Sequence, residues 1–266
     1  MSGWENDSLS ELYARLDDLC AKAERGETAI SPFLTPRELY FSKIFLARRG
    51  ALHQGFGGYA DSERQRIYVL PDYMDAEGVE LSALLQDFGL SCEITALKIE
   101  GSGYRTLTHR DFLGSLLGLG IHRDVLGDIV ITGDKGREAV FFCDSVIAPF
   151  IESSLEKVAS DKVKVKPIAI EEGFLPERKF APIHDTVASP RFDCIVASLC
   201  SLSRAKAAEV ISAGLAELDF ECEERADRTV TPPAMISVRG YGKFRVHSVS
   251  DKTKRGRFRL VADKYI

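Results

Sequence analysis

The stretch IVITGDKGREAVFF, residues 129–142, decides the fold of the central part of the chain. Two runs of β-branched and aromatic residues enclose a centre of glycine and charged residues, Gly133-Asp134-Lys135-Gly136. Runs of this kind favour strands, and the centre has the composition of a tight turn. We therefore predict two strands, at 129–131 and 139–142, joined by a turn.

The residues on either side of these strands continue the pattern. On the N-terminal side, residues 94–99 have the composition of a strand, and Thr108 is placed to cap a helix. On the C-terminal side, Asp144 is placed to cap a second helix, and residues 163–168 complete the set as a strand. The order βαββαβ is the ferredoxin-like arrangement. RNA-recognition domains share it with many unrelated proteins, so the arrangement alone does not define a function.

The chain before residue 75 favours helices. Leucines at helical spacing predict a helix over residues 8–24. Thr35 and Glu38 have the spacing of a capping box, which predicts a second helix that ends before Gly50. A strand is expected at 64–70. These elements predict a small helical or αβ domain at the N-terminus.

The last part of the chain predicts two short helices followed by a small sheet. Apolar residues recur at helical spacing from Phe192, while Ser201 or Ser203 is placed to cap the second helix and Gly214 to end it. Pro176, Pro182 and Pro190 mark residues 173–190 as a linker or an ordered crossing segment. We therefore predict an α+β protein with an α-rich unit at 1–75, a ferredoxin-like (RRM-like) domain at 76–172, a linker at 173–190 and an α-β domain at 191–266.

Charge is distributed unevenly along the sequence. The formal net charge is −5, yet residues 239–259 contain eight lysines and arginines against one aspartate. A basic tail on an acidic body indicates a surface that meets a polyanion such as a nucleic acid. The alternative is a solvated β-hairpin with ordinary surface cations.

The last domain resembles the S4 RNA-binding domain, a module of ribosomal proteins, pseudouridine synthases and ribosome-rescue factors. The residues that carry the resemblance are Arg191-Phe192-Asp193, Ser203-Arg204-Ala205-Lys206-Ala207, the helix end from Ile211 to Gly214, and Ile236-Ser237-Val238-Arg239-Gly240-Tyr241-Gly242-Lys243-Phe244. The resemblance and the basic tail together predict RNA contacts at Arg191, Ser203, Arg204, Lys206, Arg239, Lys243, Arg245, Lys254, Arg255 and Arg257.

The start of the second helix in this domain has a physical reason to bind an anion. A helix N-terminus offers free backbone N–H groups and the positive end of the helix dipole, which suit phosphate. Ser203, Arg204 and Lys206 lie in this first turn. Cations there oppose the dipole, so their placement is favourable when an anion binds. A surface helix with two incidental cations is the alternative.

A narrower resemblance covers about residues 30–264. The segments Phe56-Gly57-Gly58-Tyr59, His109-Arg110-Asp111-Phe112-Leu113-Gly114 and Lys252-Thr253-Lys254-Arg255-Gly256-Arg257 are similar to motifs of YlmH-type proteins. That family is bacterial and cytoplasmic, has a C-terminal S4 domain and is not known as an enzyme. The resemblance implies a non-enzymatic RNA-binding protein of ribosome-associated quality control that binds rRNA or tRNA on the large ribosomal subunit. The gene neighbourhood of the family adds cell-division proteins as candidate partners.

A second RNA contact is predicted beside the glycine-rich turn. Tyr59 would stack on a base, while Arg64 and Arg66 would pair with phosphates. The alternative is a tight turn whose tyrosine packs on the helix at 36–49. The residues alone favour neither interpretation.

The segment from residue 217 to residue 224 departs from the S4 pattern. It contains five carboxylates, at Glu217, Asp219, Glu221, Glu223 and Glu224. Carboxylates close to phosphate would repel it, so we expect this segment on a face turned away from RNA.

Other classes of site have no support in the sequence. No CxxC, HExxH or GxSxG motif occurs and the histidines do not cluster, so we predict no catalytic residue, metal site or cofactor. No apolar run approaches the roughly 18 residues that span a bilayer, so we expect a cytoplasmic protein without a membrane partner. Two other functions stay open: an RNA-modifying enzyme targeted by its S4 domain, and an interaction scaffold associated with cell division.

Overall fold

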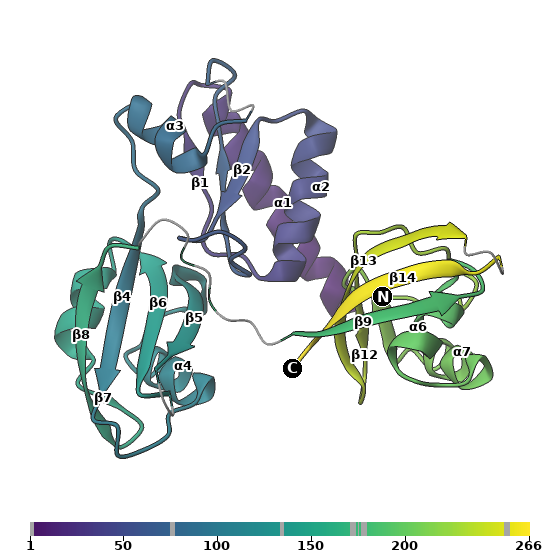
Figure 1. The fold of residues 1–266 in the computed structure, drawn as a ribbon. Helices are drawn as coiled ribbons and strands as arrows, with labels where there is room; N and C mark the ends of the chain where they lie inside the picture. The colour runs from purple at the N-terminus through teal and green to yellow at the C-terminus, as the bar shows by residue number, and fades with distance from the viewer. Residues whose placement is uncertain are drawn as a thin grey trace. The chain divides into compact units, whose positions relative to one another are not determined.

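The structure is a computed structural model that describes residues 3–74, 78–133, 136–170, 174, 176, 180–252 and 256–266. It divides into two compact units, one that ends at Pro176 and one that begins at Glu177. Both units contain helices and antiparallel sheets (Figure 1). The predicted α+β class is therefore confirmed.

The first unit begins with two helices and a small sheet. The elements are α1 (Gly3–Ala23), β1 (Ala29–Ile30), α2 (Pro36–Arg49), β2 (His53–Phe56) and β3 (Arg66–Val69), and the sheet has the order β1-β3-β2. The start of α2 is fixed by the predicted capping box, in which Thr35 and Glu38 satisfy each other's backbone N–H groups. Gly50 ends the helix with φ of 71°, a left-handed conformation that favours glycine.

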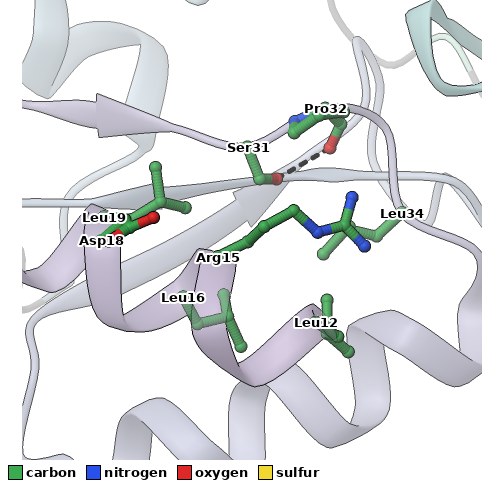
Figure 2. Close-up of a pocket in the computed structure, with 8 residues that line it drawn as sticks. All are labelled: Leu12, Arg15, Leu16, Asp18, Leu19, Ser31, Pro32 and Leu34. Carbon is green, nitrogen blue, oxygen red and sulfur yellow. Dashed lines mark hydrogen bonds between the residues drawn. The ribbon is translucent and has the colours of Figure 1, made fainter. Parts of the chain in front are cut away.

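An apolar cavity lies between α1 and the segment after β1 (Figure 2). It measures about 210 Å³. The side chain of Arg15 crosses it towards Leu34, and the Ser31 hydroxyl donates to the Pro32 carbonyl at its rim, 2.7 Å away. The lining residues are Leu12, Arg15, Leu16, Asp18, Leu19, Ser31, Pro32 and Leu34.

The rest of the first unit has the predicted βαββαβ order. Its elements are α3 (Leu81–Asp87), β4 (Ile94–Gly101), α4 (His109–Leu117), the 3-10 turn η1 (Arg123–Val125), β5 (Leu126–Thr132), β6 (Glu138–Asp144), α5 (Ala148–Ser154), β7 (Lys157–Val158) and β8 (Asp161–Ile168). The sheet order β5-β6-β4-β8 is that of a ferredoxin-like domain, and β7 extends it by a short hairpin. Thr108 caps α4 through a capping box with Asp111, as predicted for Thr108.

One cap prediction in this part is wrong. Asp144 ends β6 instead of starting α5, which begins at Ala148. Its carboxylate accepts the Val146 N–H, as in a turn, and pairs with the guanidinium of Arg66 at 3.0 Å. Pairing of β6 with β4 extends through Asp144 and delays the start of the helix.

The second unit is a six-stranded antiparallel sheet with two helices. Its elements are β9 (Phe180–Val187), α6 (Phe192–Leu199), α7 (Arg204–Ser212), β10 (Ala216–Leu218), β11 (Glu221–Cys222), β12 (Ala234–Val238), β13 (Gly242–Lys252) and β14 (Phe258–Tyr265). The sheet order is β11-β10-β12-β13-β14-β9. Buried side chains of α6 and α7 pack on one sheet face and form a single core with Phe244, Val246 and Leu260.

The prediction of a linker at 173–190 needs correction. Residues 180–187 form β9, which pairs with β14 from Phe180 to Val187 and closes one edge of the sheet. The second unit therefore begins before residue 191. The division of the first unit into 1–75 and 76–172 stays a prediction, since both parts belong to one compact unit.

Candidate nucleic-acid interface

The N-terminus of α7 has the predicted cap. Ser203 is extended, with φ of −66° and ψ of 151°, and its hydroxyl accepts the Lys206 N–H at 3.2 Å. The N–H groups of Arg204 and Ala205 lie in the first turn, where no earlier helical carbonyl can accept them. This end of the helix therefore offers backbone donors and a positive dipole end to an anion.

Asp193, a residue of α6, holds two of the predicted arginines in place. Its Oδ1 accepts from Arg191 Nε at 3.1 Å, and its Oδ2 accepts from Arg191 Nη2 at 3.0 Å and from Arg204 Nε at 2.9 Å. The Asp193 side chain is 5% exposed, whereas the Arg204 side chain is 57% exposed. The Asp193 carboxylate is therefore buried, while the Arg204 side chain is exposed to solvent.

The ionisation of Asp193 fits this arrangement. Burial raises the pKa of the carboxyl, but hydrogen bonds from Arg191 and Arg204 outweigh it and hold the pKa below its ordinary value. Asp193 is thus a carboxylate at neutral pH. A fixed carboxylate orients Arg204 before any ligand arrives, which lowers the entropy cost of a later contact.

An open groove of about 400 Å³ lies beside Arg204. Arg257 also lines it, and its Nε donates to the Thr186 hydroxyl at 2.9 Å. The groove is also lined by hydroxyl residues and by one carboxylate, Asp185, which accepts from Ser198. Hydrogen bonding from Ser198 lowers the pKa of Asp185, so it stays ionised. Two arginines and several hydroxyls around one groove can bind phosphate.

The other predicted cations divide into separate groups. Lys243 and Arg245 lie on β13 at positions that alternate with Phe244 and Val246 of the core, so they occupy the sheet face opposite the helices. Arg245 is exposed, while the ammonium of Lys243 lies 5.1 Å from the centre of the Tyr265 ring. The structure therefore does not bring these two residues to the groove of Arg204.

The remaining cations have individual positions. Arg239 is exposed in the turn between β12 and β13. Lys206 forms an exposed ion pair with Glu209 at 2.8 Å. Lys254 and Arg255 lie outside the described residues.

The acidic segment 217–224 lies at the opposite edge of the sheet from the groove. Its strands β10 and β11 form one end of the sheet, whereas Thr186 and Arg257 lie at the other end, with β9 and β14. Phosphate in the groove would therefore lie away from these carboxylates. That this segment faces away from RNA stays a prediction.

The predicted second contact at Tyr59, Arg64 and Arg66 is wrong. Tyr59 is 5% exposed, donates to Asp128 Oδ2 at 2.7 Å and packs its ring 5.0 Å from that of Phe142. No face of Tyr59 is presented to a base. The alternative of a tight turn describes the segment better, although the tyrosine packs on β6 and not on α2.

Both arginines of this segment are buried by partners within the unit. Arg64 donates from Nε to the Leu126 carbonyl at 2.9 Å and from Nη2 to the Phe33 carbonyl at 3.1 Å. Arg66 donates from Nε to the Ser31 carbonyl at 2.8 Å and pairs with Asp144. These contacts satisfy the guanidinium groups inside the fold, so they have a structural role.

Sequence reasoning overlooked two carboxylates. Asp193 is part of the S4-like motif Arg191-Phe192-Asp193, but the motif did not predict its hydrogen bonds to Arg191 and Arg204. Asp128 accepts from the Tyr59 hydroxyl and from the N–H groups of Glu63 and Arg64, at 2.7 to 3.0 Å. It thereby fixes the turn at 59–64 to β5. The sequence signal was an aspartate inside an otherwise apolar or glycine-rich strand.

Two other kinds of site are absent from the described part of the chain. No group of three or more His, Cys, Asp or Glu side chains there is placed to hold a metal ion. None of the helices there is long and apolar enough to cross a membrane.

Comparisons with known proteins agree with the motifs in the sequence. Residues 86–172 match the family described as "Putative RNA-binding domain in YlmH". The chain is 27% identical over 245 residues to "Ribosome-associated protein quality control protein P2" of Bacillus subtilis strain 168, which covers 91% of this chain and 89% of the relative.

A solved structure titled "Cell division protein ylmH from Streptococcus pneumoniae" matches with a TM-score of 0.47 at 23% identity, over 60% of this chain and 90% of that chain. The resemblance to YlmH-type proteins is confirmed by the family match and the curated relative. Residues 86–172 therefore resemble the RNA-binding domain of YlmH, and the chain is similar to the Bacillus subtilis relative over most of its length.

Proposed function

We propose that this protein is a non-enzymatic RNA-binding protein that binds rRNA or tRNA on the large ribosomal subunit during ribosome-associated quality control. The observation that carries the proposal is the groove between Arg204 and Arg257, with Arg204 anchored on Asp193. Two further findings support it: the RNA-binding domain family at residues 86–172 and the name of the Bacillus subtilis relative.

The groove would bind the sugar-phosphate backbone. Arg204 and Arg257 have guanidinium N–H groups that can donate to phosphate oxygens, and such charge-assisted bonds are stronger than neutral ones. The hydroxyl of Ser201 and the free N–H groups at the start of α7 would add neutral donors. Contacts of this kind position an RNA without recognising its bases. The three-dimensional structure of the RNA, and not its base sequence, would therefore determine which RNA is bound.

Ribosome co-sedimentation with an Arg204→Glu variant tests the proposal. The substitution reverses the charge in the groove, so we expect much weaker binding to large subunits. Arg15→Glu is the control, because Arg15 is also exposed and the change of charge is the same. Equal losses from the two variants, or no loss from Arg204→Glu, would contradict the assignment of the groove.

Salt dependence supplies an independent measurement. Each phosphate contact in the complex makes log affinity fall by roughly 0.7–0.9 per log unit of salt. We expect a steep decrease for the wild type and a shallower one for Arg204→Glu. Ribosome association that is insensitive both to salt and to RNase would instead indicate a protein scaffold.

A further inference from the structure

The sheet of the βαββαβ domain has one face without helices. Helices α4 and α5 cover the other face, where Phe112 and Ile151 pack with Leu97 and Phe141. Part of the helix-free face is also covered. The rings of Tyr59 and Phe174 lie 5.0 and 6.3 Å from that of Phe142. A base therefore has no access to this aromatic residue at the centre of the sheet.

The rest of the helix-free face, on β4 and β8, is cationic. Lys162, Lys164 and Lys166 occupy alternate positions of β8 and are exposed, whereas Val163 and Val165 between them pack against the core under the helices. Alternation places the three lysines on the helix-free face, with about 6.7 Å between neighbours. Lys157 of β7 is opposite Lys162 and is also exposed.

Two of the nearby carboxylates, Glu100 and Glu138, are engaged by two other lysines, while Glu152 and Glu156 line the same hollow as Lys157, Lys162 and Lys164. Lys98 Nζ lies 2.8 Å from Glu138 Oε2 and 3.1 Å from Glu100 Oε1. Lys166 Nζ lies 3.0 Å from the same Glu100 oxygen. These bonds lower the pKa of Glu100 and raise that of Lys98, so the pairs stay charged.

Three ammonium groups on this face have no such partner. Among the described residues, no carboxylate lies within ion-pair distance of Lys157, Lys162 or Lys164. Residues 86–172 as a whole contain ten lysines and arginines against fourteen aspartates and glutamates. Unpaired cations on one short hairpin of an acidic domain are therefore a local feature and not a consequence of composition.

We propose that Lys157, Lys162 and Lys164, here called the lysine row, form a second RNA contact that binds phosphates of one strand. The proposal rests on the proposed function, since it adds a surface to the same RNA-binding activity. Successive lysines at alternate strand positions can follow successive phosphates. RNA is the ligand that the charge of the row and the RNA-binding family of this domain both favour.

The row predicts binding without base recognition. Strands β4, β7 and β8 contain no aromatic residue, and the aromatic Phe142 is covered. Stacking, which RNA-recognition domains use for sequence selectivity, therefore has no platform on the strands of the row. The contact would be electrostatic and largely independent of base sequence.

The test uses the full chain with Lys162→Gln and Lys164→Gln combined. We expect roughly five- to tenfold weaker binding to single-stranded RNA at low salt, equal for poly(A) and poly(U). The slope of log affinity against log salt should decrease by about 1.4–1.8, for two lost phosphate contacts. The combined variant Lys22→Gln and Arg25→Gln, which removes two positive charges from the end of α1 and the turn after it, should bind as the wild type does.

Each outcome bears on the inference separately from the proposed function. Arg204→Glu could weaken binding while the Lys162/Lys164 variant leaves affinity and slope unchanged. In that case the assignment of the lysine row as an RNA contact is wrong, and the assignment of the groove is retained. If poly(A) and poly(U) lose affinity unequally, base recognition is present and the inference is overturned. If neither variant changes binding, or the wild type binds no RNA, both assignments fail. An acidic protein captured through the row in nuclease-treated extract would also contradict it.

Discussion

Asp193 shows how a single buried carboxylate prepares a cationic site. An Asp193→Asn substitution keeps the size of the side chain and removes the charge that holds Arg191 and Arg204. The variant is one unit more positive, so a surface that attracts RNA by net charge alone would bind more tightly. A positioning role predicts the opposite, which is weaker RNA binding together with a loss of about 1–3 kcal/mol in the free energy of unfolding. RNA titration and urea unfolding of the same variant distinguish the two.

The pH dependence of this stability follows from the direction of the Asp193 pKa. The pKa is lowered in the folded state, so the carboxylate stabilises the fold above its unfolded pKa of about 3.9 and loses the effect as pH falls through the folded value. The difference in unfolding free energy between wild type and Asp193→Asn should therefore be full at pH 7 and shrink below about pH 4. A difference that stays constant from pH 7 to pH 3 would show that the charge of Asp193 does not stabilise the fold.

At the scale of elements, the turn between β2 and β3 depends on glycine. Gly58 has φ of 102°, and an added Cβ would overlap the ring of Phe142. Gly58→Ala should therefore lower the free energy of unfolding by about 3 kcal/mol, from backbone strain and overpacking together. Gly50→Ala is a matched control, since φ is 71° and no atom lies within 4 Å of the added Cβ. Its expected cost is only about 1 kcal/mol. Equal costs in urea unfolding would contradict the packing argument.

Local signals explain which elements could be predicted from the sequence. The capped starts of α2, α4 and α7 depend on residues three positions apart, and all three were predicted. The strand β9 was not predicted, because its hydrogen bonds go to β14, more than seventy residues later. Asp144 was misjudged for the same reason, since its strand partner and Arg66 lie far away in the sequence.

The candidate site shows the same limit. The cap of α7 and the cations around it were predicted from neighbouring residues. The burial of Arg64 and Arg66 could not be predicted from the sequence, because the carbonyls that accept their hydrogen bonds come from distant segments. The lysine row was overlooked because an alternating strand in a ferredoxin-like domain was interpreted only as part of the core.

At the scale of the whole molecule, cations are placed in small, organised sets. The second unit contains the groove between Arg204 and Arg257, and the first unit contains the lysine row. The groove is also lined by Asp185 and uses Asp193 to orient Arg204, and the hollow at the lysine row is also lined by Glu152 and Glu156. A long RNA could engage both units at once, and two linked contacts raise the effective affinity without a new interface.

The boundary of the second unit gives the last prediction. A fragment of residues 177–266 contains β9, which pairs with β14 at eight positions and buries Val187 in the core. A fragment of residues 191–266, cut where the sequence alone places the domain, lacks β9 and leaves the edge of β14 exposed. We expect the longer fragment to unfold cooperatively and to bind RNA in a salt-dependent manner, and the shorter one to aggregate or to lose its thermal transition. Thermal unfolding followed by circular dichroism measures this, and equal transitions for the two fragments would show that β9 is dispensable.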